Sequence, residues 1–134
     1  MKRVSAAWFI LVVIFALAGT ASAQSTLRAN IPFDFAVGET HMDKGEYVVH
    51  VDSSVVQLTK VKGSGAAMSL VHTASLERSQ PQNALVFRRY GDAIFLWKVL
   101  RAEGVARELP QTRGEIEIAR NYRRGPTIET ATAK

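Results

Sequence analysis

The stretch from Leu85 to Leu100, LVFRRYGDAIFLWKVL, constrains the fold more than any other part of the chain. Two runs rich in β-branched and aromatic residues flank Tyr90-Gly91-Asp92, a turn signal typical of a β-hairpin. The two-residue turn is either Tyr90-Gly91 or Gly91-Asp92, and both choices pair odd positions with even ones. We therefore expect an antiparallel hairpin at the centre of a β-rich domain.

Both faces of this predicted hairpin carry large apolar side chains. Alternation assigns one face to Leu85, Phe87, Ile94, Leu96 and Leu100. It assigns the other face to Val86, Tyr90, Phe95, Trp97 and Val99. Two apolar faces are expected of strands inside a closed or double-layered sheet.

The first residues predict export. Met1-Lys2-Arg3 is a basic start, an apolar run follows, and Ala21-Ser22-Ala23 matches the small-x-small pattern of signal peptidase. We interpret residues 1–23 as a signal peptide cleaved before Gln24, and the protein as periplasmic or extracellular. An uncleaved membrane anchor is the alternative, but the run is short for a full span. If the signal peptide is cleaved, we expect the protein to contact the membrane only through residues 1–23, before cleavage.

Composition excludes several classes of protein. The chain has 134 residues and no cysteine, so a disulfide framework, a lipoprotein anchor and a thiol nucleophile are all excluded. Removal of residues 1–23 leaves about 110 residues, which suits a single domain with its own core. The formal net charge of +5 falls by two with Lys2 and Arg3, and acidic residues are interspersed. We therefore expect no nucleic-acid partner.

Apolar alternation with a period of two continues outside the hairpin. From Leu27 to Phe35 every odd position is apolar, although Pro32 places this strand at an edge or breaks it. Further strands are predicted over residues 46–52, 55–61, 66–73 and 105–109.

A helix is predicted after the strands. Thr112-Arg113-Gly114-Glu115 fits a capping box, in which Thr112 accepts from the Glu115 amide and Glu115 reaches back. Gly125-Pro126 is a stop signal. Residues 115–118 also alternate as a strand would, but the start and stop signals favour a short helix. We expect the small, polar residues 126–134 to be disordered.

The predicted architecture is mainly β: a single antiparallel β-sandwich or small barrel of six to seven strands with a short C-terminal helix. The domain organisation is a signal peptide over 1–23, the β domain with its terminal helix over 24–125, and a disordered tail over 126–134.

Candidate chemistry is sparse. The three histidines, His41, His50 and His72, have no second ligand at a recognised metal-binding spacing. Sheet pairing that brought His50 or His72 against a carboxylate in a polar cleft would support a small hydrolase. Without such a cleft we predict no catalytic residues, no metal and no cofactor.

One group of residues suggests a binding surface. Arg88, Arg89, Tyr90 and Asp92 surround the hairpin turn, where cations and aromatic rings can stack on sugars or on a partner's side chains. The alternative is cross-strand stabilisation, with Arg88 lying over an aromatic neighbour. The ten-residue connection Ala74–Asn83 is a second candidate, because long loops often carry binding sites.

Several motifs occur in a fixed order along the mature chain. They are Ile31-Pro32-Phe33-Asp34-Phe35, Gly45-Glu46-Tyr47, the run from Leu85 to Asp92, and Arg107-Glu108-Leu109-Pro110. Together they resemble a family of small exported proteins, mainly from acidobacteria, to which no activity is attached. The resemblance departs at Met42-Asp43-Lys44-Gly45, where relatives often have Leu-Pro-Ala-Gly. It implies export and one small β-rich domain, and it supplies no catalytic residues.

The predicted function is that of a non-enzymatic, exported binding or structural protein of the envelope. Its partner would be an envelope or extracellular protein or a glycan. A small barrel that holds an apolar ligand is the alternative, because both hairpin faces are apolar. An uncovered apolar face would also allow a homodimer.

Overall fold

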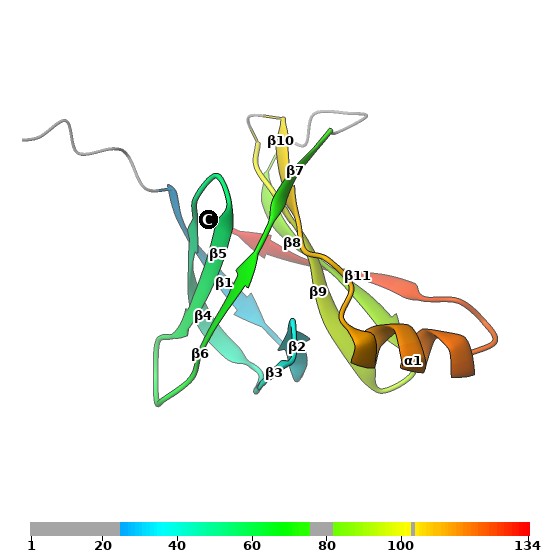
Figure 1. Ribbon diagram of the computed structural model, residues 1–134. Coiled ribbons are helices and arrows are strands. Elements are labelled where there is room, and N and C mark those ends of the chain that lie inside the picture. Colours follow the sequence, from blue (N-terminus) through cyan, green and yellow to red (C-terminus); the bar gives the residue numbers. More distant parts are fainter. Residues whose placement is uncertain (1–24, 76–81, 103) are drawn as a thin grey trace, which may run out of the picture.

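The computed structural model describes residues 25–75, 82–102 and 104–134 (Figure 1). The predicted signal peptide over 1–23 and most of the Ala74–Asn83 connection lie outside the described residues. Within the described ranges, no helix is long and apolar enough to cross a membrane.

The described chain is mainly β, with one short helix, as predicted. Its strands and helix are β1 (Ser25–Ile31), β2 (Phe35–Val37), β3 (Thr40–Met42), β4 (Gly45–Val51), β5 (Val55–Lys60), β6 (Ala66–Leu70), β7 (His72–Ser75), β8 (Asn83–Tyr90), β9 (Ala93–Leu100), β10 (Val105–Glu108), α1 (Arg113–Asn121) and β11 (Thr127–Ala133).

These strands form one sheet that curls into a nearly closed barrel. Neighbouring strands follow the order β3-β2-β9-β8-β11-β1-β4-β5-β6. Strands β6 and β7 are separated only by Val71 and cross from the β5 side to β10, which in turn pairs with β9 (Figure 1). The curl leaves few free edges, which limits unwanted pairing with other chains.

The strand count exceeds the predicted six to seven. The predicted strand over 27–35 ends at Ile31, since Pro32 cannot donate to the ladder, and the chain resumes pairing at Phe35. The predicted strand over 66–73 is divided at Val71. Two further strands were not predicted at all: β3, placed in a connection, and β11.

Strand β11 corrects the predicted disordered tail over 126–134. It lies between β1 and β8, and its register with β8 runs from Thr127↔Arg89 to Ala133↔Asn83. Ala131 and Ala133 are buried in the main core, whereas Thr130 and Thr132 are exposed. Small residues suit this position, because backbone hydrogen bonds to β8 stabilise the strand with little apolar side-chain burial.

The central hairpin forms as predicted over β8 and β9, with Gly91-Asp92 as its turn. Gly91 has a φ of 64°, as the first position of a type II′ turn requires. A β-bulge follows: Phe87 pairs with Leu96 but Val86 pairs with Lys98, so Trp97 is an extra residue.

This bulge makes the predicted faces wrong beyond Trp97. Val99 lies in the main core with Leu85, and Leu100 lies in a second cluster with Val86. The sequence alternation had placed Val99 on the face of Val86 and Leu100 on the face of Leu85. One extra residue in β9 shifts the alternation by one position, which moves each following side chain to the opposite face.

The main core fills the barrel interior. The ring of Phe35 lies at its centre, with ring centroids 5.4 Å from Phe87 and 5.4 Å from Tyr47 in edge-to-face geometry. The second, smaller cluster lies on the other face of β8 and β9. Helix α1 packs against this same face of β8 and β9, near the Gly91-Asp92 turn.

Candidate ligand-binding groove

Helix α1 begins where the capping signal predicts. The side chain of Thr112 accepts a hydrogen bond from the Glu115 amide at 3.3 Å, and the helix runs from Arg113 to Asn121. The reciprocal hydrogen bond of the predicted capping box, from the Glu115 side chain back to the start of the helix, is not formed. The Glu115 carboxylate points toward the hairpin instead. Glu115 is the buried residue of the helix, with 3% of its surface exposed.

A buried ion pair fastens the helix to the hairpin. Nε of Arg88 lies 2.7 Å from Oε1 of Glu115, and Nη2 donates to Oε2 at 3.3 Å. The Tyr90 hydroxyl donates to Oε1 at 3.3 Å. A carboxylate taken out of water needs partners of this kind, because a lone buried charge is very unfavourable.

Burial changes the pKa values of Glu115 and Tyr90. Desolvation raises the pKa of Glu115 above its ordinary value, although the positive charge of Arg88 and the Tyr90 hydrogen bond act in the opposite direction. Desolvation also raises the pKa of Tyr90, and the negative charge of Glu115 adds to that rise. Tyr90 therefore remains a neutral donor at physiological pH.

Aromatic rings surround the ion pair. The Arg88 guanidinium lies 4.9 Å from the ring centroid of Trp97, whose Nε1 donates to Glu108 at 3.0 Å. The ring of Tyr90 is 6.1 Å from Phe95 and 6.2 Å from Tyr122. The alternative interpretation of Arg88, stabilisation over an aromatic neighbour, is therefore what this geometry supports.

The four residues of the predicted binding surface, Arg88, Arg89, Tyr90 and Asp92, differ in how accessible they are to a partner. Arg88 and Tyr90 lie inside the contact between α1 and the hairpin and are not available to a large partner. Arg89 donates to the Gly91 carbonyl at 2.7 Å and lies 3.5 Å from Glu129 on β11. Of the four, only Asp92 is exposed, and it lines a groove.

This groove, with a volume of about 600 Å³, lies between the β2–β3 hairpin, the start of β9 and the first turns of α1. Its volume is in the range of small-molecule sites. Its apolar lining comes from Phe35, Ala36, Ala93, Ile94, Phe95 and Ile118. Its remaining lining residues are Asp34, Gly38, Glu39, His41, Asp92, Thr112 and Gly114.

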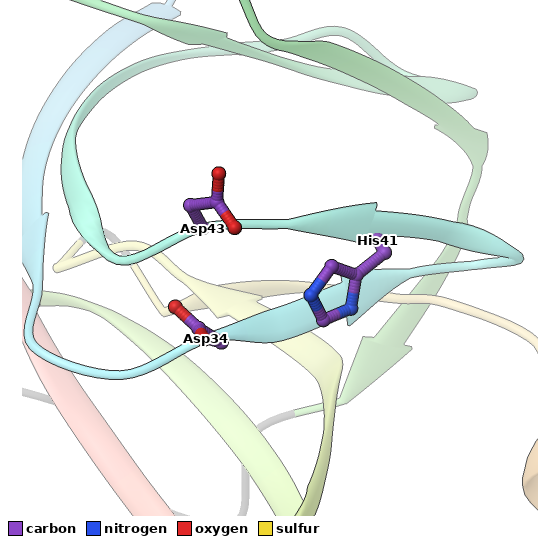
Figure 2. A group of neighbouring side chains, drawn as sticks. All are labelled: Asp34, His41 and Asp43. Atoms are coloured by element: carbon purple, nitrogen blue, oxygen red, sulfur yellow. The ribbon is translucent and has the colours of Figure 1, made fainter.

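Acidic side chains gather where the β2–β3 hairpin meets the rest of the barrel. Asp34 directly precedes β2, Asp43 directly follows β3, and the pairing of Phe35 with Met42 brings the two together. Donor atoms of Asp34, His41 and Asp43 all lie within 4.8 Å of one another (Figure 2). All three side chains are exposed, so solvent competes for them and we assign no metal to the group.

The other two histidines lie outside the groove. Nδ1 of His50 is 3.1 Å from the Thr26 hydroxyl on the neighbouring strand. Nε2 of His72 is 4.0 Å from Glu108 on the surface of β7 and β10. His72 does meet a carboxylate, but on an exposed strand surface rather than in the polar cleft that would support a hydrolase, and the geometry there supports cross-strand pairing.

Sequence reasoning missed the groove. Its walls come from three segments, over residues 34–41, 92–95 and 112–118, and the motifs to which some of these residues belong predict turns and a helix cap rather than a shared site. The one available signal was the pair of charged residues at the two ends of the β2–β3 segment, which a hairpin prediction over 34–43 would have brought together.

Comparisons with known proteins identify no relatives: no family model, no curated protein and no solved structure matches this chain.

Proposed function

We propose that this protein is an exported binding domain that takes a small ligand into the groove between the β2–β3 hairpin, β9 and α1. The observation that carries the proposal is the groove itself, which combines an apolar lining with a few polar groups at its edge. Export rests on the signal-like residues 1–23 and on the resemblance to small exported proteins.

Binding is favoured over catalysis by the chemistry of the lining. Apolar side chains such as Phe95 and Ile118 provide contact area, and the polar groups at the edge are exposed carboxylates and one imidazole. This differs from the predicted binding surface at the hairpin turn, since Asp92 is the one residue of that surface that lines the groove. The proposal therefore moves the site from the turn to the groove beside it.

The experiment uses Nile red, a neutral dye that fluoresces in apolar surroundings. We expect saturable enhancement of its emission with the full chain. The variant Ala93→Trp places a large ring in the groove and should abolish most of this signal. The matched control Thr59→Trp adds the same ring at an exposed position of β5 and should bind the dye as the native protein does. A folded Ala93→Trp variant that binds the dye normally would refute the groove as the site.

A further inference from the structure

The groove offers two kinds of surface to a ligand. Of its apolar lining residues, Phe95 and Ile118 are half-buried, so an apolar body that enters displaces water from these two side chains. The exposed carboxylates of Asp34 and Asp92 lie toward one end of it, because the parallel pairing of Ala36 with Phe95 places Asp34 beside the start of β9. Glu39 lies at the other end, in the β2–β3 turn. A ligand that used both surfaces would need an apolar body and a polar head.

The charge of the groove is opposite to that of the chain. The chain carries a formal net charge of +5. The described residues that line the groove nevertheless include three carboxylates, on Asp34, Glu39 and Asp92, and neither a lysine nor an arginine. Asp43 adds a fourth carboxylate beside Asp34. A local cluster of one sign in a concave surface attracts ligands of the other sign and repels anions.

The two surfaces together narrow the class of ligand. A bare metal ion would use the carboxylates but would gain nothing from the apolar lining. A neutral apolar molecule would gain nothing from the carboxylates. A protonated amine joined to an apolar body uses both, and the half-buried ring of Phe95 offers a further favourable contact to its cationic head.

From this charge complementarity we propose that the ligand of the groove is a small amphiphilic organic cation, with a protonated amine at the acidic edge and an apolar body against Phe95 and Ile118. This inference rests on the proposed function, because it specifies the ligand of the same groove.

The test compares three compounds of similar size and different charge: 2-phenylethylamine, 2-phenylethanol and 3-phenylpropionate. Binding to the full chain is followed through the NMR amide signals of three groove residues, Gly38, Ala93 and Gly114. We expect the amine to bind about fivefold or more tightly than the alcohol, as partly solvated ion pairs allow. The carboxylate should bind more weakly than either. High salt should reduce the preference for the amine, because these carboxylates are exposed.

Charge-removing variants locate the effect. Asp92→Asn should lower the affinity for the amine about two- to fivefold and leave the affinity for the alcohol unchanged. Glu39→Gln, at the other end of the groove, should lower the affinity for the amine less. The matched control is Asp52→Asn, which removes an exposed turn carboxylate between β4 and β5 outside the groove lining. It should leave the affinity for both compounds unchanged.

The outcomes separate this inference from the proposed function. Equal affinities for the amine and the alcohol at the groove signals would overturn the inference and leave the groove as a binding site. If none of the three compounds shifts these signals, the inference falls, and the proposed function falls with it only if Nile red also fails to bind. Shifts at Asp34, His41 and Asp43 with Zn²⁺, Mg²⁺ or Ca²⁺ alone, without any effect of the amine, would also overturn it.

Discussion

Arg88 on strand β8 and Glu115 on helix α1, 27 positions apart in the chain, form a buried ion pair with Nε and Oε1 at 2.7 Å. Their side chains are 13% and 3% exposed. The pair holds the helix to the hairpin where apolar contact is limited, since Ile116 on the same helix faces solvent. It therefore also positions one wall of the groove, which includes Thr112, Gly114 and Ile118.

Removing one partner of this pair should destabilise the protein strongly. Arg88→Met leaves the Glu115 carboxylate buried without its cation, and we expect a loss of about 3–5 kcal/mol in the free energy of unfolding. Urea denaturation measures this as a lower midpoint at unchanged slope. The control Arg89→Met removes a half-exposed arginine of the next position and should lose less than about 1 kcal/mol.

Removing both partners should restore most of the loss. In Arg88→Met combined with Glu115→Leu, apolar side chains of similar size replace the buried charges, and we expect the remaining loss to be about 1–2 kcal/mol, because the Tyr90 hydroxyl loses its Glu115 acceptor. A double variant as unstable as Arg88→Met alone would show that the pair itself, and not the abandoned carboxylate, accounts for the stability.

The raised pKa of Glu115 gives the pH dependence a definite sign. The folded protein holds this proton more tightly than the unfolded chain does. The contribution of Glu115 to stability is therefore fully present below the pKa of the unfolded carboxyl, and it is lost as the pH rises through the raised pKa of the folded state. Compared with Glu115→Gln, the native protein should gain stability as the pH falls from about 7 to about 4. Urea denaturation of both proteins at several pH values checks this, and a difference that shrinks with acidification would contradict it.

Neighbouring residues of β11 distinguish a strand from a disordered tail. Ala131 faces the main core with 6% of its surface exposed, whereas Thr130 faces solvent. Ala131→Asp buries an unpaired carboxylate and should destabilise the protein by about 3 kcal/mol or more. Thr130→Asp, the control, should change the free energy of unfolding by less than about 1 kcal/mol. Thermal or urea denaturation compares them; equal effects would mean that β11 does not pack as described.

The helix cap should contribute measurably to both stability and the groove wall. Thr112→Ala removes the oxygen that accepts from the Glu115 amide, and we expect a loss of about 1 kcal/mol. Thr112→Ser keeps the hydroxyl acceptor and should lower the free energy of unfolding by only a few tenths of a kcal/mol. Circular dichroism at increasing urea concentration compares the two variants. Equal losses would point to the methyl group of Thr112 rather than to the cap.

Local patterns predicted the elements whose causes are local. Gly91-Asp92 forms the hairpin turn because glycine takes the required positive φ, and Thr112 caps α1 because its hydroxyl reaches an amide three residues on. Both signals act within a few residues, so no knowledge of the rest of the chain was needed. The same is true of Pro32, whose missing N–H ends β1 early.

Elements that depend on distant partners could not be predicted in this way. Residues 127–133 have a weak apolar pattern, and they form a strand because β1 and β8 offer hydrogen-bonding edges on either side. The extra residue at Trp97 is likewise invisible to alternation, since a bulge is a mismatch between two strands and not a property of one.

The sequence by itself determined a single β-rich domain with a central hairpin and a short capped helix, since periodicity, turn chemistry and capping are encoded within a few residues. Only the tertiary structure decided that the sheet curls into a nearly closed barrel, that Glu115 is buried against Arg88, and that three segments far apart in the chain meet in an acidic groove. Burial and electrostatic environment arise from contacts between residues far apart in the chain, and their free energies depend on the complete packing rather than on local pattern.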